Sequence, residues 1–364
     1  MFTEERHHTQ AGSRDWVIGP EFVAIRDGKV ATMPTIDIAP RPPVTVTGVL
    51  DDPELAWQLC EANGPYAHVL MLREFAASLD AYYESARVGS RDAVGVVVDD
   101  ELMTMPIYRG DWVSSRAVHI AGVEGVLHNE RLLEAAAQVF DAEIVRPLIV
   151  YSNLTAPMPQ NRRHTDVPTF RGVERSEYPA WVVSAMAASG LFERWRVKVA
   201  TAVAWYYDGP NGGFSYWPAG ADAPAVTIEP PSNTAVVGDN DFMFHRVEAV
   251  GDGRFALVPI DSLLSFDDSA RRWLITKEDR DFGEFDRDDI RISISWKAEC
   301  FHDAEDARVF DEHLDDITFD QVLDTWRADC LTRGLALPDT AVPLADPAFA
   351  AAIGAAYAGP LSTA

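Results

Sequence analysis

The sequence predicts an α+β fold in which a β-sandwich or barrel lies between helical flanks. Between residues 145 and 301, short β-prone runs are separated by Gly, Pro, Asn and Asp at roughly ten-residue intervals, which is typical of sandwiches and barrels. The segments on either side carry apolar residues at helical spacing. A chain of 364 residues with 47% hydrophobic residues can bury a sizeable core. We expect one compact structural unit with three regions: residues 1–144, 145–301 and 302–364.

The first region is expected to be a mainly helical support packed on the core. It opens with β-prone pieces such as EFVAIRDGKVATM and a Pro-rich connector, APRPPVTVTGVL. From residue 52 to residue 90 the pattern becomes helical, with Asp and Pro in capping positions. The run NERLLEAAAQVFDA predicts a further helix over residues 129–142.

The middle region alternates strands with turn residues and one helical insertion. The runs EIVRPLIVYSNLTA and RRHTDVPTF predict strands, and EYPAWVVSAMAASGLFERWRV predicts the helix. The run WYYDGPNGGFSYW predicts a hairpin, because Asn-Gly-Gly can adopt positive φ between two aromatic strands. The runs WLITKE and DDIRISISWKAECF are expected to pair with each other. In the last region, DITFDQVLDTWRADCLTRG predicts a helix that ends at Gly.

Composition narrows the partners that the chain can have. The net charge of -26 repels phosphate backbones and anionic membrane surfaces, so we expect neither nucleic acid nor a membrane as partner. The N-terminus lacks the apolar core of a signal peptide, and no run of about 18 apolar residues could span a bilayer. Three cysteines without CxxC spacing indicate a reducing compartment. We therefore expect a cytoplasmic protein with a small-molecule substrate, and the sequence leaves its oligomeric state open.

A candidate metal site begins in the run RRHTDVPTF. His164 and Asp166 are two residues apart, so on an extended segment both side chains point to the same side. His245 in DNDFMFHRVEAV is the best third ligand from a distant strand. Two histidines and one carboxylate suit non-haem Fe(II). Taken alone, the first pair also fits a surface turn before a proline, and His245 fits a hydrogen-bonded core histidine.

The order of the surrounding runs makes the metal site more specific. HTDVPTFRG, YYDGPNGGFSYWPAG, EPPSNTAVVGDNDFMFHRV and RISISW together resemble the Fe(II)/2-oxoglutarate-dependent oxygenase superfamily, over about residues 145–301. The resemblance implies a double-stranded β-helix (jelly-roll or cupin-like) core, with His164, Asp166 and His245 as iron ligands. It also implies 2-oxoglutarate and dioxygen as cosubstrates, and a ferryl oxidant for hydroxylation, desaturation or ring formation. The intact Asp166 argues against halogenation, for which some relatives replace this residue.

The resemblance further implies an arginine that binds the far carboxylate of 2-oxoglutarate through its guanidinium fork. Arg254 follows His245 at about the separation found in most relatives. Arg291 lies much further along the chain, but it has the Arg-x-Ser pattern, with Ser293 on the same face of its strand. We favour Arg291 with Ser293, which makes residues 255–285 an insertion, and Arg254 stays the alternative.

Other interpretations of the same residues stay open. The chain could be a cupin-like metal enzyme that does not use 2-oxoglutarate, or a non-catalytic ligand-binding β-helix protein. The insertions at residues 171–196 and 255–288 are long enough to act as lids. Four arginines bracket the first metal motif and either pair with acidic groups or bind a substrate carboxylate: Arg162, Arg163, Arg171 and Arg175. Tyr151 and Asn153 could hydrogen-bond the cosubstrate. Several strand aromatics are expected to pack in the core, with one or two lining the pocket: Trp205, Tyr206, Tyr207, Tyr216 and Trp217.

Overall fold

The computed structural model of the chain describes residues 25–26, 29–30, 39–72, 79–89, 94–174, 177–229, 232–252 and 256–357. The chain divides into two units, residues 1–35 and residues 36–364. In the first unit, β1 (Ile25–Arg26) pairs antiparallel with β2 (Lys29–Val30). All the elements that follow belong to the second unit.

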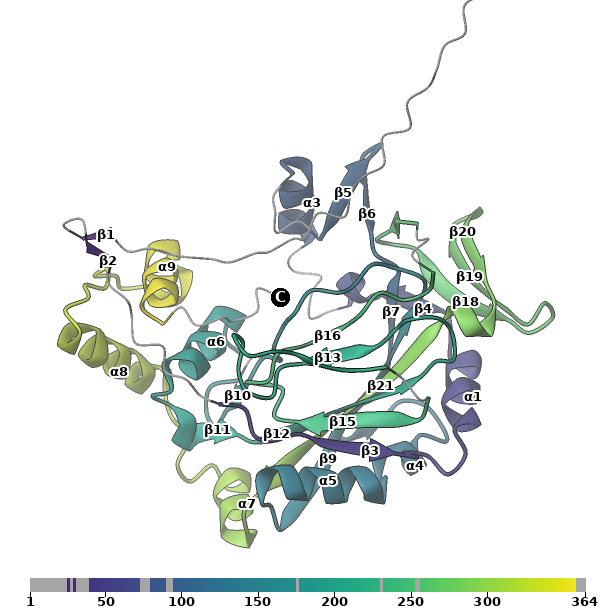
Figure 1. Cartoon of the computed structure of the whole chain (residues 1–364). Coiled ribbons are helices and arrows are strands. Elements are labelled where there is room, and N and C mark those ends of the chain that lie inside the picture. Colours follow the sequence, from purple (N-terminus) through teal and green to yellow (C-terminus); the bar gives the residue numbers. More distant parts are fainter. Residues whose placement is uncertain are drawn as a thin grey trace, which may run out of the picture. The chain divides into compact units, whose positions relative to one another are not determined.

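The largest sheet of the second unit is antiparallel and has 11 strands. Along the sheet these are β20 (Arg280–Phe285), β19 (Arg272–Lys277), β18 (Leu263–Asp267), β4 (Tyr66–His68), β7 (Ile107–Ser114), β9 (Ile144–Thr155), β21 (Arg291–Phe301), β12 (Val199–Tyr206), β15 (Thr234–Gly238) and β3 (Val44–Thr47). The short strand β8 (Ala117–Val118) pairs with β7. We call this the main sheet, and Figure 1 shows it behind a smaller one.

The smaller sheet joins β14 (Val226–Ile228), β13 (Phe214–Tyr216) and β16 (His245–Val247). A bridge between His164 and His245 adds the segment around residue 164 to its edge. The chain thus runs from β9 to the His164 segment, back to β12, across to β13 and β14, back to β15, across to β16 and back to β21. The chain therefore crosses repeatedly between two facing sheets, with one hairpin, β13–β14, inside the smaller sheet. This arrangement is a double-stranded β-helix, and it confirms the predicted fold class.

Two short sheets complete the strand inventory of the described residues. One joins β10 (Thr169–Phe170) and β11 (Arg196–Val197), and the other joins β17 (Val258–Pro259), β6 (Glu101–Thr104) and β5 (Gly95–Val98). The α-helices are α1 (Glu54–Ala62), α3 (Leu79–Arg87), α4 (Glu124–Leu127), α5 (Glu130–Phe140), α6 (Ala180–Ser189), α7 (Ala304–Asp311), α8 (Phe319–Thr332) and α9 (Pro347–Ala356). Short 3₁₀ helices are η1 (Val69–Met71), η2 (Glu193–Trp195), η3 (Arg287–Asp289) and η4 (Pro343–Ala345).

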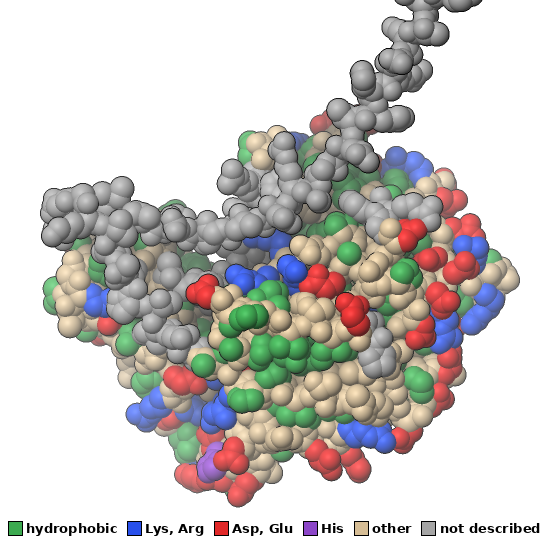
Figure 2. Space-filling model, viewed as in Figure 1, with side chains coloured by type: hydrophobic (Ala, Val, Ile, Leu, Met, Phe, Trp, Pro, Cys, Tyr) green, Lys and Arg blue, Asp and Glu red, His purple; other side chains and the backbone are tan. Residues whose placement is uncertain are grey.

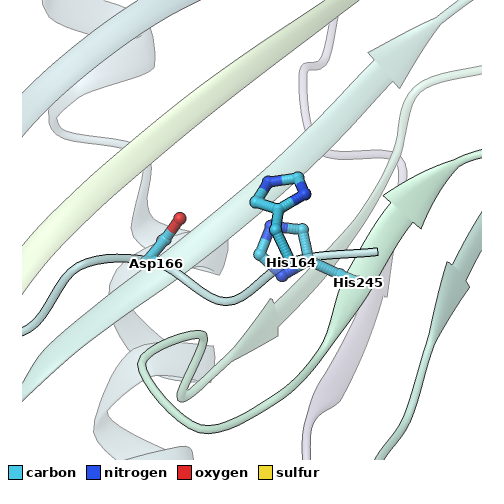
Figure 3. Close-up of side chains that lie close together, drawn as sticks. All are labelled: His164, Asp166 and His245. Carbon is cyan, nitrogen blue, oxygen red and sulfur yellow. The ribbon is translucent and has the colours of Figure 1, made fainter. Parts of the chain in front are cut away.

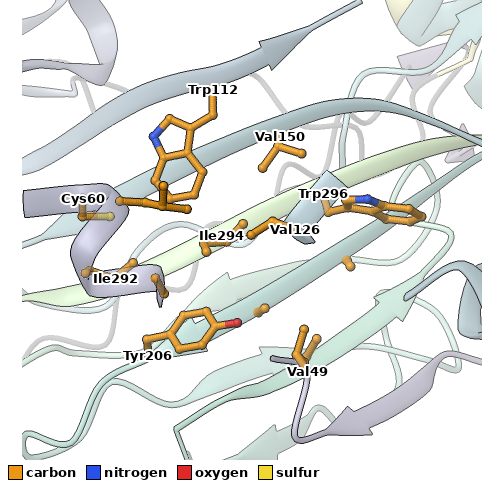
Figure 4. Packing of buried hydrophobic residues seen from close by; sticks show 14 of the residues in the cluster. Val49, Cys60, Trp112, Val126, Val150, Tyr206, Ile292, Ile294 and Trp296 are labelled. Atoms are coloured by element: carbon orange, nitrogen blue, oxygen red, sulfur yellow. The ribbon is translucent and has the colours of Figure 1, made fainter. Parts of the chain in front are cut away.

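The helices α1, α4 and α5 cover one face of the main sheet and form the largest core (Figure 4). Helix α5 begins at the predicted place, because the Asn129 side chain accepts a hydrogen bond from the Leu132 N–H. Alternating residues of β21, such as Ile292 and Ile294, point into this core. The next residue of that series, Trp296, donates its indole N–H to the Leu127 carbonyl at 2.8 Å. The helix side of the sheet is therefore dry and closely packed.

The opposite face of the main sheet turns toward the smaller sheet and is more polar. Because side chains alternate along a strand, Arg291, Ser293 and Lys297 of β21 share this inner face. Thr201 of β12 lies opposite Lys297 in register, and Trp205 lies opposite Ser293. The space between the two sheets therefore receives charged and hydroxyl groups from neighbouring strands.

A second core joins the insertion after the first metal motif to the C-terminal helices. Helix α6 contacts α9, and its buried residues pack with Trp326 of α8 and Phe349 of α9. Val167 and Phe242, each close in sequence to a candidate metal ligand, pack against the same cluster. The cluster thus supports the two loops that carry the candidate ligands. Whether residues 171–196 also move as a lid stays a prediction.

Two strand pairings predicted from the sequence are wrong. The strands flanking the Asn-Gly-Gly turn do not form a hairpin, because β12 pairs with β15 and β21 whereas β13 pairs with β14 and β16. The turn itself has the expected positive φ, at 62° for Asn211 and 74° for Gly212, but it carries the chain from one sheet to the other. The run WLITKE lies in β19, which pairs with β18 and β20 and not with β21. Strands β18 to β20 satisfy one another's backbone hydrogen bonds within the insertion. Strand β21 pairs instead with β9 and β12 of the barrel.

Residues 39–144 contribute more than helices. Their strands β3, β4 and β7 join the main sheet. The sequence analysis expected a mainly helical support with a few strands. The division into three regions stays a prediction.

All three cysteines, Cys60, Cys300 and Cys330, are buried and free. Within the part of the chain that the structure describes, no helix has both the length and the apolar character needed to cross a membrane.

Replacing Gly212 tests the turn at Asn211 and Gly212, which carries the chain from the main sheet to the smaller one. Gly212→Ala should cost more free energy of unfolding than Gly48→Ala, because both glycines have positive φ (74° and 66°) but an added Cβ at residue 212 meets the Tyr207 ring at 2.7 Å. The Gly48 site has no atom within 4 Å, so its cost should be the backbone strain alone, about 1–2 kcal/mol. Urea unfolding of both variants measures the difference, and equal destabilisation would contradict the crowding at Gly212.

Candidate metal centre

The side chains of His164, Asp166 and His245 lie close together (Figure 3). Each offers one ligand atom, and these atoms all lie within 4.8 Å of one another. The two histidines are brought together by the backbone: the His164 N–H donates to the His245 carbonyl at 3.1 Å, and the His245 N–H donates back at 2.9 Å. Their ring centroids are 4.4 Å apart. The distant histidine thus lies where the sequence analysis placed it, beside the pair at 164 and 166.

Both imidazoles are held in the same tautomer. His164 Nδ1 lies 3.0 Å from the Arg162 carbonyl oxygen, and His245 Nδ1 lies 3.1 Å from the Met243 carbonyl oxygen. A carbonyl oxygen only accepts, so each Nδ1 carries the hydrogen and each Nε2 keeps a free lone pair. A backbone carbonyl bound to the second ring nitrogen is the usual way in which proteins orient a metal-binding histidine.

The carboxylate of Asp166 is fixed through one of its two oxygens. Lys297 Nζ donates to Oδ2 at 2.7 Å, and the Thr201 hydroxyl donates to the same oxygen at 3.0 Å. Oδ1 receives no hydrogen bond from any described residue. Burial opposes charge on both members of the pair, yet their mutual attraction holds the pKa of Asp166 below its usual range and the pKa of Lys297 above it. The carboxylate is therefore ionised and aligned.

The loop before His245 is tied down by a buried ionic network. Arg196 donates to both oxygens of Asp239 at 3.1 Å and to Asp241 at 3.1 Å. The next carbonyl in this loop, that of Asn240, accepts the Asp166 N–H at 2.8 Å. Burial raises the pKa of Asp241 to about 7, although Arg196 opposes the shift and Asp239 adds to it. The network links the loop that precedes His245 directly to the backbone of Asp166.

Arg291 lies on the same inner face, and no described residue provides a counterion for it. It is 0% exposed, and its Nε donates to the Gly212 carbonyl at 2.8 Å. Its two terminal nitrogens are buried and have no hydrogen-bond partner among the described residues. Burial lowers the pKa of the guanidinium to about 10, so it is still charged at neutral pH. A buried cation with two unused donors indicates that an anionic ligand completes this site.

The other arginine considered for this role, Arg254, lies outside the described residues. Ser293 is 3% exposed on the same inner face as Arg291, as the sequence pattern predicted.

The arginines near the first metal motif have different environments. Arg171 is largely buried and pairs with Asp306 and Asp315, so it holds the C-terminal region in place. Arg163 donates to the Ala221 carbonyl and lies over the rings of two aromatic residues, and Arg162 is exposed. Arg175 lies outside the described residues. Figure 2 shows Lys and Arg side chains gathered near the middle of the viewed face, above β13 and β16, in a chain of net charge -26.

The remaining residues singled out in the sequence divide between the inner face and the cores. Tyr151 and Asn153 of β9 lie on the inner face and are half-buried; Arg109 of β7 stacks on Tyr151 at 4.0 Å and donates to Asn153 at 3.2 Å. Trp205 and Tyr216 pack between the two sheets. The other aromatics lie elsewhere: Tyr206 packs in the helix-side core, Tyr207 packs against Met158 and Val250, and Trp217 is buried beneath Arg163.

Two residues that hold Asp166 were missed by the sequence analysis. Lys297 continues the alternation that starts at Arg291 and Ser293, so the run RISISWK already placed it on the inner face. Thr201 had no comparable signal, because a lone threonine in an apolar strand is ordinary. The pairing of β12 with β21 brings the two together at Asp166.

The candidate ligands lie on a defined order of strands: the His164 segment is bridged to His245 of β16, and Asp166 lies two residues after His164 on the same segment. The chain has the double-stranded β-helix fold. In this fold the main sheet consists centrally of β9, β21, β12 and β15, and the smaller sheet carries both histidines. No family model and no curated protein sequence matches the chain.

Solved structures align with the chain at low sequence identity. An oxidoreductase of the 2OG-Fe(II) oxygenase family from Burkholderia pseudomallei is 12% identical, over 68% of this chain and 89% of that one, with a TM-score of 0.31. The non-heme alpha-ketoglutarate-dependent epimerase SnoN from nogalamycin biosynthesis is 12% identical, over 71% and 79%, with a TM-score of 0.36. HygX from Streptomyces hygroscopicus, solved with nickel, 2-oxoglutarate and hygromycin B bound, is 9% identical, over 71% and 83%, with a TM-score of 0.32.

Removing the Lys297 charge should destabilise the metal-free protein. Lys297→Met leaves the largely buried Asp166 carboxylate without its cation, which should cost about 2–4 kcal/mol of unfolding free energy. A divalent ion would supply the missing positive charge, so Co(II) should stabilise this variant more than the wild type. Thermal unfolding with and without Co(II) measures this, and Lys198→Met, which removes a lysine next to the same strands, is the control. Equal stabilisation of variant and wild type by Co(II) would contradict the pairing.

The stability of the metal-free protein should fall between about pH 6.5 and pH 4. Burial lowers the pKa of His68 to about 4; burial, helped by His164, also lowers that of His245 to about 4, although Asp166 acts the opposite way. The unfolded chain binds protons at both residues near pH 6.5, whereas the folded chain does not. Each histidine should therefore cost up to about 3 kcal/mol as the pH falls through this window. Chemical unfolding at several pH values measures the slope, and His68→Gln should make it shallower.

Proposed function

We propose that the protein is a mononuclear non-haem Fe(II)- and 2-oxoglutarate-dependent oxygenase that acts on a small molecule. The observation that carries the proposal is the buried guanidinium of Arg291, whose two terminal nitrogens have no partner among the described residues. It lies on the inner face of the same barrel that holds the His164, Asp166 and His245 side chains. Three such ligands alone suit several metals. The arginine adds a need for a carboxylate, which favours a ligand that has both a chelating end and a carboxylate end.

The donor set fits a ferrous ion. Two imidazole nitrogens and one carboxylate oxygen are the ligands of the facial triad, which leaves coordination positions for small molecules. His164, Asp166 and His245 would hold the ion, with 2-oxoglutarate and dioxygen as cosubstrates. A bound iron would supply the redox chemistry of dioxygen activation, which amino-acid side chains lack.

The residues around the candidate site orient the three ligand side chains and exclude water. Lys297 and Thr201 keep Oδ2 of Asp166 engaged, so Oδ1 is the oxygen left for a metal. The carbonyls behind the two imidazoles fix their direction before any ion arrives. Buried aromatic side chains, Phe214 among them, fill the space between the sheets and exclude water. In such a low-dielectric setting Arg291 would bind a carboxylate more strongly than an exposed arginine does.

The proposed substrate is a small molecule, and the proposed outcome is hydroxylation, desaturation or ring formation. The net charge of -26 disfavours nucleic acid. Tyr151 and Asn153 are only half-buried on the inner face of β9, so this part of the barrel is accessible to a ligand. An ionised Asp166, held by Lys297, supports retention of all three ligands and therefore disfavours halogenation.

Anaerobic titration tests the proposal. Adding Fe(II) and 2-oxoglutarate should produce a weak visible charge-transfer band, and oxygen should then yield succinate. Arg291→Gln should weaken 2-oxoglutarate binding about 30-fold or more, because it removes the charged partner of a buried carboxylate. Arg254→Gln should leave that binding nearly unchanged, and neither substitution should alter the affinity for the metal alone.

Each other outcome identifies a different function. The absence of both the band and succinate would defeat the proposal. Metal binding in which neither arginine affects 2-oxoglutarate would indicate a cupin-like enzyme that does not use the keto acid. Tight binding of 2-oxoglutarate without succinate would indicate a non-catalytic ligand-binding protein.

A further inference from the structure

A second donor without a partner among the described residues lies on the strand next to that of Arg291. The indole N–H of Trp205 is buried and has no hydrogen-bond partner among the described residues, and the side chain is 0% exposed. Leaving such a group unpaired costs about 1–3 kcal/mol. A ligand that supplies an acceptor at this position would recover that cost.

The strand register places this indole close to the arginine. Trp205 of β12 lies directly opposite Ser293 of β21, and Arg291 is the next residue of β21 on the same face. Residues directly opposite have Cβ atoms about 5 Å apart, and diagonal neighbours about 7–8 Å, which long side chains can bridge. The indole, the hydroxyl and the guanidinium therefore face one region.

The same indole lies on the metal side of the barrel. Its ring stacks on Phe214 with centroids 5.7 Å apart, and Phe214 lies 5.9 Å from the His245 ring. Trp205 is thus connected to the candidate metal centre through one aromatic ring and to Arg291 through the neighbouring strand. A ligand that reaches from the metal to Arg291 would pass this indole.

Its surroundings set Trp205 apart from the other indoles. The N–H groups of Trp112, Trp273 and Trp326 also have no partner among the residues that the structure describes, but they lie in the helix-side core or in the core around α6 and α8, among apolar side chains. Trp205 lies between the two sheets, where the described residues leave the terminal nitrogens of Arg291 without partners as well. Two donor groups that both need acceptors, on adjacent strands and the same face, indicate one shared anionic ligand.

We propose that the indole N–H of Trp205 donates a hydrogen bond to the carboxylate that Arg291 binds. A carboxylate has about four acceptor sites. The two terminal nitrogens of Arg291, the Ser293 hydroxyl and the Trp205 indole supply four donors. Trp205 is then a binding residue that favours a ligand carrying a carboxylate next to Arg291. This inference rests on the proposed function.

The test compares Trp205→Phe with Trp273→Phe, a control that removes an equally buried indole from the helix-side core. Calorimetry of the Zn(II)-loaded proteins should show 2-oxoglutarate binding about tenfold or more weaker in Trp205→Phe, since a hydrogen bond to a charged group is lost. The affinity for Zn(II) alone should be unchanged, and the control should bind 2-oxoglutarate like the wild type. Wild-type affinity in Trp205→Phe would overturn the inference.

A second readout uses the wild-type chain, so it does not depend on the folding of a variant. The ¹⁵N-indole NMR signal of Trp205 should move downfield when 2-oxoglutarate is added to the Zn(II)-loaded protein, while the signal of Trp273 should not. Binding measured by calorimetry without a shift of the Trp205 signal would overturn the inference and leave the proposed function intact. A wild-type protein that binds no 2-oxoglutarate with any divalent ion would overturn the proposed function itself.

Discussion

The reciprocal backbone hydrogen bonds between His164 and His245 are the constraint on which the site depends. They join the His164 segment to β16 at the edge of the smaller sheet. The backbone alone therefore places the two imidazoles side by side. Because Asp166 is two residues further along the same segment, its carboxylate is brought to the same place. Any change that separated these two strands would disperse all three groups at once.

The buried charged side chains are of two kinds: those paired with an opposite charge within the chain, and one for which no described residue provides such a partner. Asp166 forms an ion pair with Lys297, and Arg196 forms one with Asp239, so these buried charges are paired within the chain. Arg291 is buried as deeply, yet no described residue offers it an acid. Since an unpaired buried cation is costly, its persistence on the inner face is more informative about function than any of the paired ions.

The insertions around the barrel form strands and helices of their own. Residues between β16 and β21 form β17 to β20, of which β18 to β20 extend the main sheet beyond β4. Residues between the first metal motif and β11 form α6, which packs with α8 and α9 into a separate core. That core contacts Val167 and Phe242, so the C-terminal helices support the loops of the candidate metal centre through apolar packing. Lys297 and Thr201 support the same centre through hydrogen bonds.

The sequence alone determined the β-rich core, a helix that begins after Asn129 and the pair of His164 and Asp166, because alternation, capping and the HxD spacing are local properties. His245 was selected from the order of the surrounding runs. It also ranked Arg291 above Arg254 through the Arg-x-Ser alternation. Only the tertiary structure decided which strands pair: the Asn-Gly-Gly turn is local, but whether it closes a hairpin or crosses between sheets depends on β15 and β21. The same holds for Lys297 and the indole of Trp205. Their partners, or lack of partners, come from strands far apart in the chain, and nothing in the nearby sequence encodes that register.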